Sequence, residues 1–246
     1  MKRAINNLSA RTANPGRQCV ILFARYPEKG KVKTRLVPPL TGREALELYK
    51  LMLAGALTTI KRSGKSPVIF CAPGRSVKAF KKLYGRKLDC RAQKGKDIGA
   101  RMRNAFAGVF ASGFSEAVLA GCDIPDLSVK ILRVAFRGLK KAGVTVGPAG
   151  DGGYYLIGFE RGDFLPQLFS GVAWGSPAVL AETLKIIKKH GREAAILAEL
   201  KDIDTIDDLI CFAGRGKQGR NSSRLLKYAS RILESKIRTR GRVKDE

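Results

Sequence analysis

The sequence predicts an α/β protein, a three-layer sandwich with a mostly parallel central sheet. Short apolar runs rich in Val and Ile alternate with amphipathic stretches along most of the chain. Most of these runs are hydrophobic almost throughout, so both of their faces are expected to be buried, as in a parallel sheet covered by helices. With 246 residues the chain is also long enough to bury a full core.

The apolar runs predict strands, in chain order, at residues 19–25, 66–72, 87–92, 117–123 and 144–149. A further strand is expected where a Tyr-Tyr-Leu-Ile run begins at Tyr154, directly after a glycine-rich stretch. Ligands of open α/β sheets bind at the carboxyl ends of the strands. Functional side chains are therefore expected in the segments that follow these strands.

The amphipathic stretches predict helices at residues 41–62, 75–85, 97–112, 128–141, 176–190 and 205–213. The first has a capping box, since Thr41 is followed three residues later by Glu44. Ser128 is expected to cap the fourth helix. The resulting order of strands and helices is that of an α/β sandwich.

The net charge of +26 is shared between a core and two tails. We expect a basic, disordered N-terminal extension at 1–17 (net +4), one folded domain at 18–213 (+14) and a basic C-terminal tail at 214–246 (+8) that could form an amphipathic helix. The tail is expected to lack apolar anchors, so its removal should leave the core folded. The charge suits anionic ligands such as phosphates and a non-specific grip on polyanions through the tails, although a lineage with basic proteins would explain it equally well.

Composition excludes several other classes of protein. The five cysteines include no C-x-x-C pair, which indicates small buried residues in a reducing compartment and excludes a disulfide framework or zinc site. The N-terminus has no apolar signal region, and no run of 18 apolar residues could span a membrane. We therefore expect a cytoplasmic protein. His190, the single histidine, lies at a helix end among lysines and is expected to be solvated.

Two glycine motifs are misleading. "GRGKQG" (214–219) matches G-x-G-x-x-G, but it follows a helix in a basic tail, where a dinucleotide site would follow a strand. "GKVKT" (30–34) lacks the second glycine and the spacing of a P-loop.

The loop "ARYPEKGKVKTRL" (24–36) follows the first predicted strand and presents four cations, Lys29, Lys31, Lys33 and Arg35. Lysine and arginine neutralise different phosphate oxygens, and the amides of a Gly-containing loop can add hydrogen bonds. This loop predicts a diphosphate or triphosphate site, with a solvated basic loop as the alternative.

The stretch "GCDIPDLS" (121–128) ends a buried strand in a carboxylate, Asp123. A carboxylate is costly to leave unpaired there, and divalent cations that bridge phosphates are common partners. Asp126 could serve the same site or cap the next helix.

A third stretch, "GPAGDGGYYLIGF" (147–159), surrounds Asp151 with glycines at the mouth of a strand. Gly152 and Gly153 would let a ligand approach the backbone, and Asp151 could accept a hydrogen bond or act as a general base. The alternative is a tight turn, because D-G is a common turn dipeptide.

Together with "QKGKDIGARM" (93–102), "WGSPAVLAET" (174–183) and "DIDTIDDL" (202–209), these motifs resemble bacterial glycosyltransferases linked to arsenosugar biosynthesis, also called radical-SAM/selenodomain-associated transferases. That family is similar to nucleotide-diphospho-sugar transferases of GT-A-like fold, with a Rossmann-like nucleotide-binding half. The resemblance covers residues 18–213 and neither tail. It departs from the family pattern at Cys122 and Ile124, and at Lys94, where a lysine in place of arginine would weaken a bidentate contact.

The resemblance implies roles for matching residues. A nucleotide and its phosphates would lie among Ala24, Arg25, Gly30, Lys33 and Arg35, and its base and ribose among Gln93, Gly95, Asp97 and Arg101. Asp123 and Asp204 would bind Mg²⁺ or Mn²⁺, both of which take oxygen ligands. Tyr154 and Trp174 could offer apolar faces to a sugar or base.

The implied activity is metal-dependent transfer of a sugar from a nucleotide-diphospho-sugar to a small acceptor. Lys33 and Arg35 would stabilise the leaving diphosphate, and Asp151 would accept the proton of the acceptor. Two alternatives remain open. One is nucleotidyl transfer from an NTP to a phosphorylated molecule with release of pyrophosphate. The other is a nucleic-acid-binding protein with an inactive transferase core, although the core has no RNA-binding motif.

Overall fold

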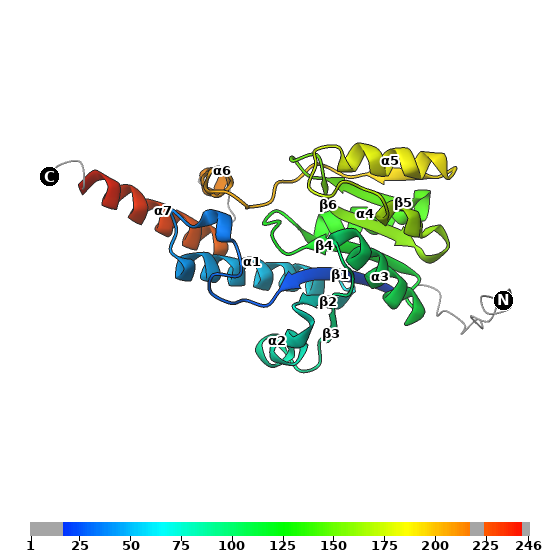
Figure 1. Cartoon of the computed structure of the whole chain (residues 1–246), viewed down its shortest axis with the longest axis horizontal. Coiled ribbons are helices and arrows are strands. Elements are labelled where there is room, and N and C mark those ends of the chain that lie inside the picture. Colours follow the sequence, from blue (N-terminus) through cyan, green and yellow to red (C-terminus); the bar gives the residue numbers. More distant parts are fainter. Residues whose placement is uncertain (1–16, 217–223, 243–246) are drawn as a thin grey trace.

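Seven strands form one sheet in the computed structural model, which describes residues 17–216 and 224–242 (Figure 1). Their order is β3-β2-β1-β4-β6-β5-β7. The strands are β1 (Gln18–Arg25), β2 (Ser66–Ala72), β3 (Asp89–Ala92), β4 (Glu116–Gly121), β5 (Gly143–Pro148), β6 (Tyr154–Glu160) and β7 (Glu193–Ile196). β6 is antiparallel to both of its neighbours, and the other pairings are parallel. The predicted α/β class with a mostly parallel sheet is confirmed.

Helices cover both faces of the sheet. One core cluster joins α1 (Gly42–Arg62), α2 (Val77–Tyr84) and α4 (Val129–Ala142) to one face, and a second joins α3 (Ile98–Ala111) and α5 (Val179–Lys189) to the other. Alternate residues of β1 divide between the two clusters, with Leu22 in the first and Ile21 in the second. This division follows from the pleat, which points successive side chains to opposite faces.

The helix starts follow the predicted capping signals. The Glu44 backbone N–H donates to the Thr41 hydroxyl (3.2 Å), and the Glu44 carboxylate accepts from the Thr41 backbone N–H (2.6 Å), which completes the capping box of α1. The Ser128 hydroxyl accepts from the backbone N–H of Ile131 (3.3 Å) at the start of α4. Both caps are confirmed.

Two differences from the predicted strands concern the site. β4 ends at Gly121, so Asp123 lies two residues beyond the strand and not at its last position. β7 was not predicted, because its sequence Glu-Ala-Ala-Ile is short and contains two alanines and a glutamate, which are weak strand formers, and its residues are at most partly buried. It is formed by parallel pairing with β5 at the sheet edge.

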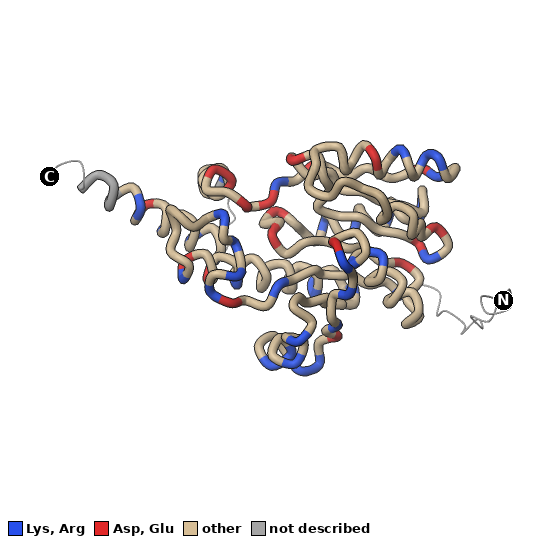
Figure 2. Tube along the Cα trace, in the orientation of Figure 1, with Lys and Arg blue, Asp and Glu red and all other residues tan. Residues whose placement is uncertain are grey.

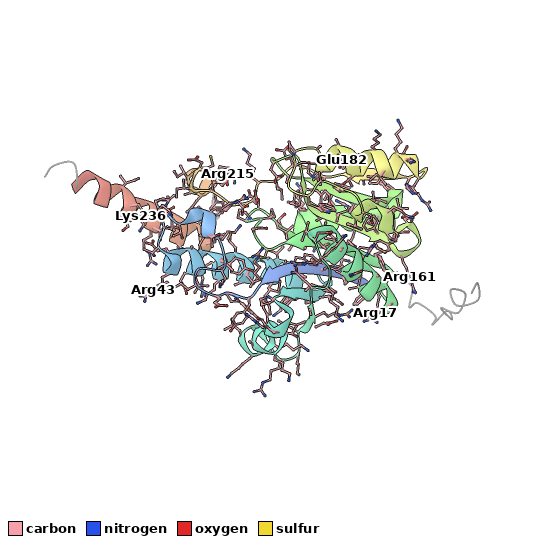
Figure 3. All side chains as sticks on the ribbon, viewed as in Figure 1. Arg17, Arg43, Arg161, Glu182, Arg215 and Lys236 are labelled. Carbon is pink, nitrogen blue, oxygen red and sulfur yellow. The ribbon has the colours of Figure 1, made fainter. Side chains whose placement is uncertain are left out.

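The C-terminal segment includes α6 (Ile206–Gly216) and α7 (Arg224–Arg242), and α7 packs against α1 and α6 (Figure 1). Ala229 and Ile232 of α7 are buried in the core cluster that contains α1. The Lys236 ammonium, labelled in Figure 3, pairs with the Glu44 carboxylate at 2.9 Å. The expectation that this segment lacks apolar anchors is therefore wrong, because one face of α7 covers α1. Residues 1–16 of the predicted N-terminal extension lie outside the described residues.

Lysines and arginines are spread over the whole described trace, as Figure 2 shows. Four of the five cysteines are buried as predicted, whereas Cys211 is exposed, and all five are free thiols. The His190 ring is exposed. Among the described helices, none combines the length and apolar character needed to cross a bilayer.

Candidate active site

The site lies where β1 and β4, neighbours in the sheet, reach their carboxyl ends. The loop after β1 carries Lys33, and the loop after β4 carries Asp123. A third segment reaches this edge from late in the chain, because the Ile203 backbone N–H donates to the Asp123 carbonyl at 3.2 Å. Parallel strands end at the same edge of a sheet, which explains why these distant segments meet.

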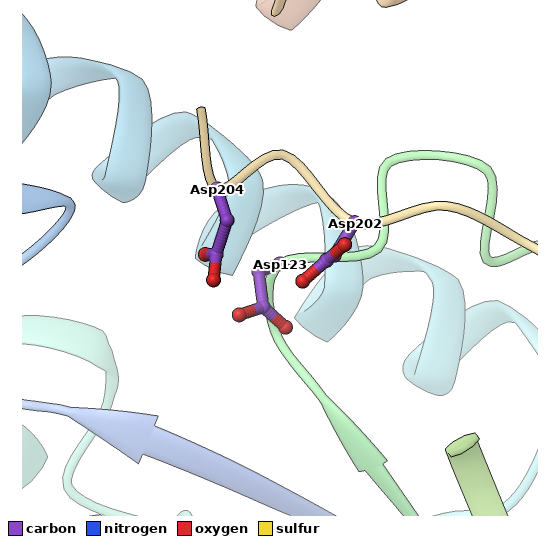
Figure 4. A group of neighbouring side chains, drawn as sticks. All are labelled: Asp123, Asp202 and Asp204. Atoms are coloured by element: carbon purple, nitrogen blue, oxygen red, sulfur yellow. The ribbon is translucent and has the colours of Figure 1, made fainter. Parts of the chain in front are cut away.

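Three carboxylates converge at this point: Asp123, Asp202 and Asp204 (Figure 4). Each offers an oxygen within 4.8 Å of the others. Clustered carboxylate oxygens are the donors that hard divalent cations prefer. Asp123 and Asp204 were named from the sequence, but Asp202 was missed. Its signal is the spacing in "DIDT", because residues two apart lie on the same side of an extended segment.

The Lys33 ammonium lies between two of these carboxylates. Its Nζ is 2.7 Å from Oδ1 of Asp204 and 3.2 Å from Oδ2 of Asp123, and its side chain is only 6% exposed. Lys33 adopts φ 48°, and among the described residues it is the one non-glycine with positive φ. That conformation costs about 1 kcal/mol or more, so the ion pairs hold a strained residue in place.

The pKa values reflect this crowding. Burial, followed by the charges of Asp204 and Asp123, raises the pKa of the Asp202 carboxyl to about 6. Burial alone would lower the pKa of Lys33, but the neighbouring Asp123 and Asp204 carboxylates outweigh it, so the Lys33 pKa is raised. The cluster thus attracts a positive charge strongly, and Lys33 supplies one.

Small and aromatic residues support the cluster. A Cβ on Gly121 would lie 2.5 Å from the Oδ1 atom of Asp123, so glycine is what lets this carboxylate fold back over the strand end. The Tyr49 hydroxyl accepts from the Arg25 backbone N–H (2.7 Å) and donates to the Arg25 carbonyl (2.9 Å), which fixes the end of β1. Asp126 does not join the cluster, because its carboxylate pairs with Arg215 of α6 at 2.8 Å.

The remaining residues of the β1 loop surround the cluster without completing it. Arg35 reaches Asp204 at 3.5 Å and is otherwise exposed, with 77% of its side chain accessible. Arg25 is exposed, Ala24 is buried in the core, and Gly30 has φ 75° in the turn before Lys33. Arg35 thus faces solvent beside the Asp204 carboxylate.

The segment predicted to hold base and ribose is tied down by its own polar groups. The Gln93 side-chain amide donates to the Phe70 carbonyl at 2.9 Å. The Asp97 carboxylate caps α3 by accepting from Ala100 at 2.7 Å, and Arg101 Nε donates to the Gly95 carbonyl at 3.2 Å. These contacts give each residue a structural role, and their nucleotide contacts stay a prediction.

The stretch around Asp151 is the hairpin turn between β5 and β6, which are antiparallel. The Asp151 carboxylate accepts from the Gly153 backbone N–H at 2.9 Å, as in an Asx turn. Gly152 has φ 85°, and a Cβ there would lie 2.2 Å from the Pro177 carbonyl oxygen. The glycine at 152 therefore makes room for Pro177, where the sequence suggested room for a ligand. Asp151 itself is exposed.

A pocket of about 330 Å³ lies between the carboxylate cluster and the β5–β6 hairpin turn, since Asp123, Asp202 and Asp151 all line it. Of the residues named from the sequence, it brings together Asp123, Asp151, Gly153, Tyr154 and Trp174, and the unpredicted Asp202 also lines it. The Tyr154 and Trp174 rings meet edge to face with centroids 6.4 Å apart. Lys33 and Arg35 lie outside its lining, as do Gln93, Gly95, Asp97 and Arg101, although Ile98 and Met102 of the same 93–102 segment contribute to it.

The sequence and fold are similar to those of known proteins. The family model "Uncharacterized protein conserved in bacteria (DUF2064)" matches residues 56–176. A crystal structure from Desulfovibrio desulfuricans G20, of a protein provisionally named a nucleotide-diphospho-sugar transferase, is 32% identical with a TM-score of 0.84, and the match covers 91% of this chain and 98% of that one. The comparison with curated proteins gives no match.

More distant structures share the fold alone. Rv0371c from Mycobacterium tuberculosis H37Rv, solved in complex with manganese, is 19% identical with a TM-score of 0.50, covering 79% of this chain and 96% of that one. The 4-diphosphocytidyl-2C-methyl-D-erythritol synthase of Anaerococcus prevotii DSM 20548 is 9% identical with a TM-score of 0.55, covering 82% and 98%. The fold is thus shared with proteins that differ widely in sequence.

Proposed function

Because the chain belongs to the same family as the Desulfovibrio protein, a family with the nucleotide-diphospho-sugar transferase fold, we propose that it is a metal-dependent glycosyltransferase. It would move a sugar from a nucleotide diphosphate to a small acceptor. The observation that carries the proposal is the arrangement at the end of β4. A cluster of three carboxylates already binds one cation, Lys33, and it adjoins a pocket that contains a separate carboxylate, Asp151. The arsenosugar-linked subfamily remains our expectation from the sequence motifs.

Asp123, Asp202 and Asp204 would hold the metal, which we propose is Mg²⁺ or Mn²⁺. The residues fit such an ion, because they are oxygen donors within 4.8 Å of one another and two of them already contact an ammonium group. When bound, the ion would neutralise charge on the diphosphate.

The protein's own cations complete this half of the site. Lys33 and Arg35 belong to the loop after β1, and both contact Asp204. They are therefore close enough to contact a diphosphate that approaches the cluster. Negative charge grows on the diphosphate as the sugar leaves, and fixed positive charge there stabilises the transition state more than the ground state. We place the nucleotide phosphates along Arg25, Gly30, Lys33 and Arg35. We place the base and ribose near Gln93, Gly95, Asp97 and Arg101.

The proposed role of Asp151 favours glycosyl over nucleotidyl transfer. An acceptor hydroxyl must lose its proton during glycosyl transfer, whereas a phosphate acceptor is already ionised. Asp151 is an exposed carboxylate on the pocket wall, held by the Gly153 N–H at one oxygen. Its other oxygen can accept the proton that the acceptor hydroxyl loses. Tyr154 and Trp174 would contact the sugar or the acceptor.

Product analysis tests the reaction type. We expect incubation with Mn²⁺ and the right nucleotide-sugar to release a nucleoside diphosphate and no pyrophosphate, measured by ion-exchange chromatography. Even without an acceptor, slow transfer of the sugar to water would give the same product. Release of pyrophosphate from an NTP would establish the nucleotidyltransferase alternative instead.

A pair of variants tests the residue roles. Asp123→Asn keeps the shape of the side chain but removes charge from the cluster, so Mn²⁺ and the nucleoside diphosphate should both bind more weakly in calorimetry. Asp151→Asn should leave that binding near normal and lower turnover by about 10²–10⁴-fold, as expected for loss of a general base. If Asp123→Asn binds Mn²⁺ as well as the wild type does, the metal assignment fails.

A further inference from the structure

The pocket beside the carboxylate cluster has an unusual charge for this protein. The chain carries a net charge of +26, yet the pocket lining contains neither lysine nor arginine. Its charged side chains are three carboxylates, those of Asp123, Asp151 and Asp202. Lys33 contacts Asp123 at 3.2 Å, whereas neither Asp151 nor Asp202 forms an ion pair with a described residue, so within a Debye length of about 10 Å at 0.1 M salt their charges act on a ligand in the pocket.

The two cations that contact the carboxylate cluster come from a different segment, the loop after β1. Lys33 and Arg35 contact Asp204 from the β1 loop and do not line the pocket. The site therefore has a cationic half that suits a diphosphate and a second half, the pocket, whose lining contains no lysine or arginine. An anion placed in the second half would lose its hydration and meet like charges.

The rest of the pocket lining is largely apolar. Trp174 is fixed on Gly99, since a Cβ at that position would lie 2.5 Å from its indole ring, and it meets Tyr154 edge to face. Phe23, Met102 and Val179 add further apolar surface. A volume of about 330 Å³ is near the lower end of the range for ligand pockets, about 300–1,000 Å³. These walls suit one small molecule with an apolar face.

We propose that the acceptor is a small uncharged hydroxyl compound with an apolar face, and that the pocket rejects phosphorylated and carboxylated acceptors. This inference rests on the proposed function. The acceptor oxygen would form the new bond to the anomeric carbon, and the bond from that carbon to the diphosphate oxygen would break. Its electron pair leaves with the nucleoside diphosphate, and the hydroxyl proton passes to Asp151.

The single tryptophan of the chain allows a direct test, because fluorescence of Trp174 reports on this pocket alone. Quenching by iodide, an anion, is compared with quenching by neutral acrylamide, each normalised to free N-acetyltryptophanamide at constant ionic strength. One carboxylate about 6 Å from the quencher should lower the local iodide concentration about threefold in a water-like dielectric. We therefore expect iodide to quench Trp174 at least about threefold less efficiently than acrylamide.

Two variants make the comparison specific. Asp151→Asn should raise iodide quenching about two- to threefold and leave acrylamide quenching unchanged. Glu193→Gln, which removes an exposed carboxylate on β7 outside the pocket lining, should change neither. Iodide quenching of the wild type that equals acrylamide quenching would overturn the proposal, as would an Asp151→Asn variant with unchanged iodide quenching.

A second arm uses acceptor probes in the presence of Mn²⁺ and a nucleoside diphosphate. Phenyl glucoside is compared with phenyl glucoside 6-phosphate and phenyl glucuronide by their effect on Trp174 fluorescence. Because the bound metal would neutralise Asp123 and Asp202, the charge of Asp151 should make the neutral probe bind at least about threefold more tightly than either anion. Tighter binding of an anion, or no binding of the neutral probe, would refute the acceptor class. These outcomes are separate from release of nucleoside diphosphate in water, which tests glycosyl transfer itself.

Discussion

Replacement of Lys33 by methionine should have opposite effects on two ligands. The variant keeps most of the buried side-chain volume but removes the charge that contacts Asp204 at 2.7 Å and Asp123 at 3.2 Å. A metal ion entering the wild-type cluster must displace this ammonium from both carboxylates. In Lys33→Met nothing has to be displaced, so Mn²⁺ alone should bind more tightly. A nucleoside diphosphate should bind more weakly, because it loses a phosphate partner.

The size of the effect follows from the two contacts. Hydrogen bonds to charged groups contribute about 1.5–3 kcal/mol each. The side chains of Asp123 and Asp204 are 35% and 38% exposed, so solvent screening should reduce the combined contribution to about 1.5–3 kcal/mol. This corresponds to Mn²⁺ affinity about 10–100-fold higher in the variant. Without metal, the variant should be less stable by a similar free energy, since the carboxylates then lack their counter-ion.

Calorimetry measures both affinities, and urea unfolding with and without Mn²⁺ measures the stabilities. Lys31→Met is the matched control, since Lys31 is an exposed lysine of the same loop. It should alter Mn²⁺ affinity by less than about twofold. If Lys33→Met binds Mn²⁺ no more tightly than the wild type, Lys33 does not compete with the metal and the reasoning is wrong.

Three further perturbations test other parts of the structure. The pKa of Asp202 is raised to about 6, so without metal the folded state binds more protons than the unfolded state between about pH 4 and 6 and loses stability as pH rises through that window. Asp202→Asn should remove this loss, about 1–2 kcal/mol after solvent screening, in urea unfolding across that range. Gly121→Ala should displace the Asp123 carboxylate, 2.5 Å from the new Cβ, and weaken Mn²⁺ binding in calorimetry by about tenfold or more. Ile232→Asp, at a position 5% exposed, should destabilise the protein by about 2–4 kcal/mol in thermal unfolding. Ile237→Asp, at a position 71% exposed, should have little effect, and equal effects of the two would show that α7 does not pack on α1.

The strands that could be predicted are those whose own sequences are apolar enough to indicate that both faces are buried. β1, β2 and β5 are apolar on both faces, so their sequences indicate central parallel strands. β7 has no such pattern, and it exists because β5 offers an unpaired edge. Local sequence carries no information about such an edge.

The candidate site was predictable where one residue carried the signal. Asp123 follows a buried strand, and Asp151 stands among glycines. Asp202 was missed because the two-residue spacing to Asp204 shows only that both side chains share one side of the segment, and where the chain returns after β7 decides whether that side faces Asp123. The buried face of α7 was missed for a related reason. Its apolar residues are separated by many cations, and only contact with α1 shows which side of the helix is covered.

The ion pair between Lys33 and Asp204 joins residues that are 171 positions apart, and this separation determines when the carboxylate cluster can form during synthesis. At about 5–20 residues per second, a ribosome needs roughly 9–34 s to proceed from the first to the second. During that interval β1, β2 and β4 can emerge and pair while the cluster still lacks two of its three carboxylates. A nascent chain therefore cannot complete this cluster early, and the capacity to bind its cation arises only after Asp204 has been synthesised.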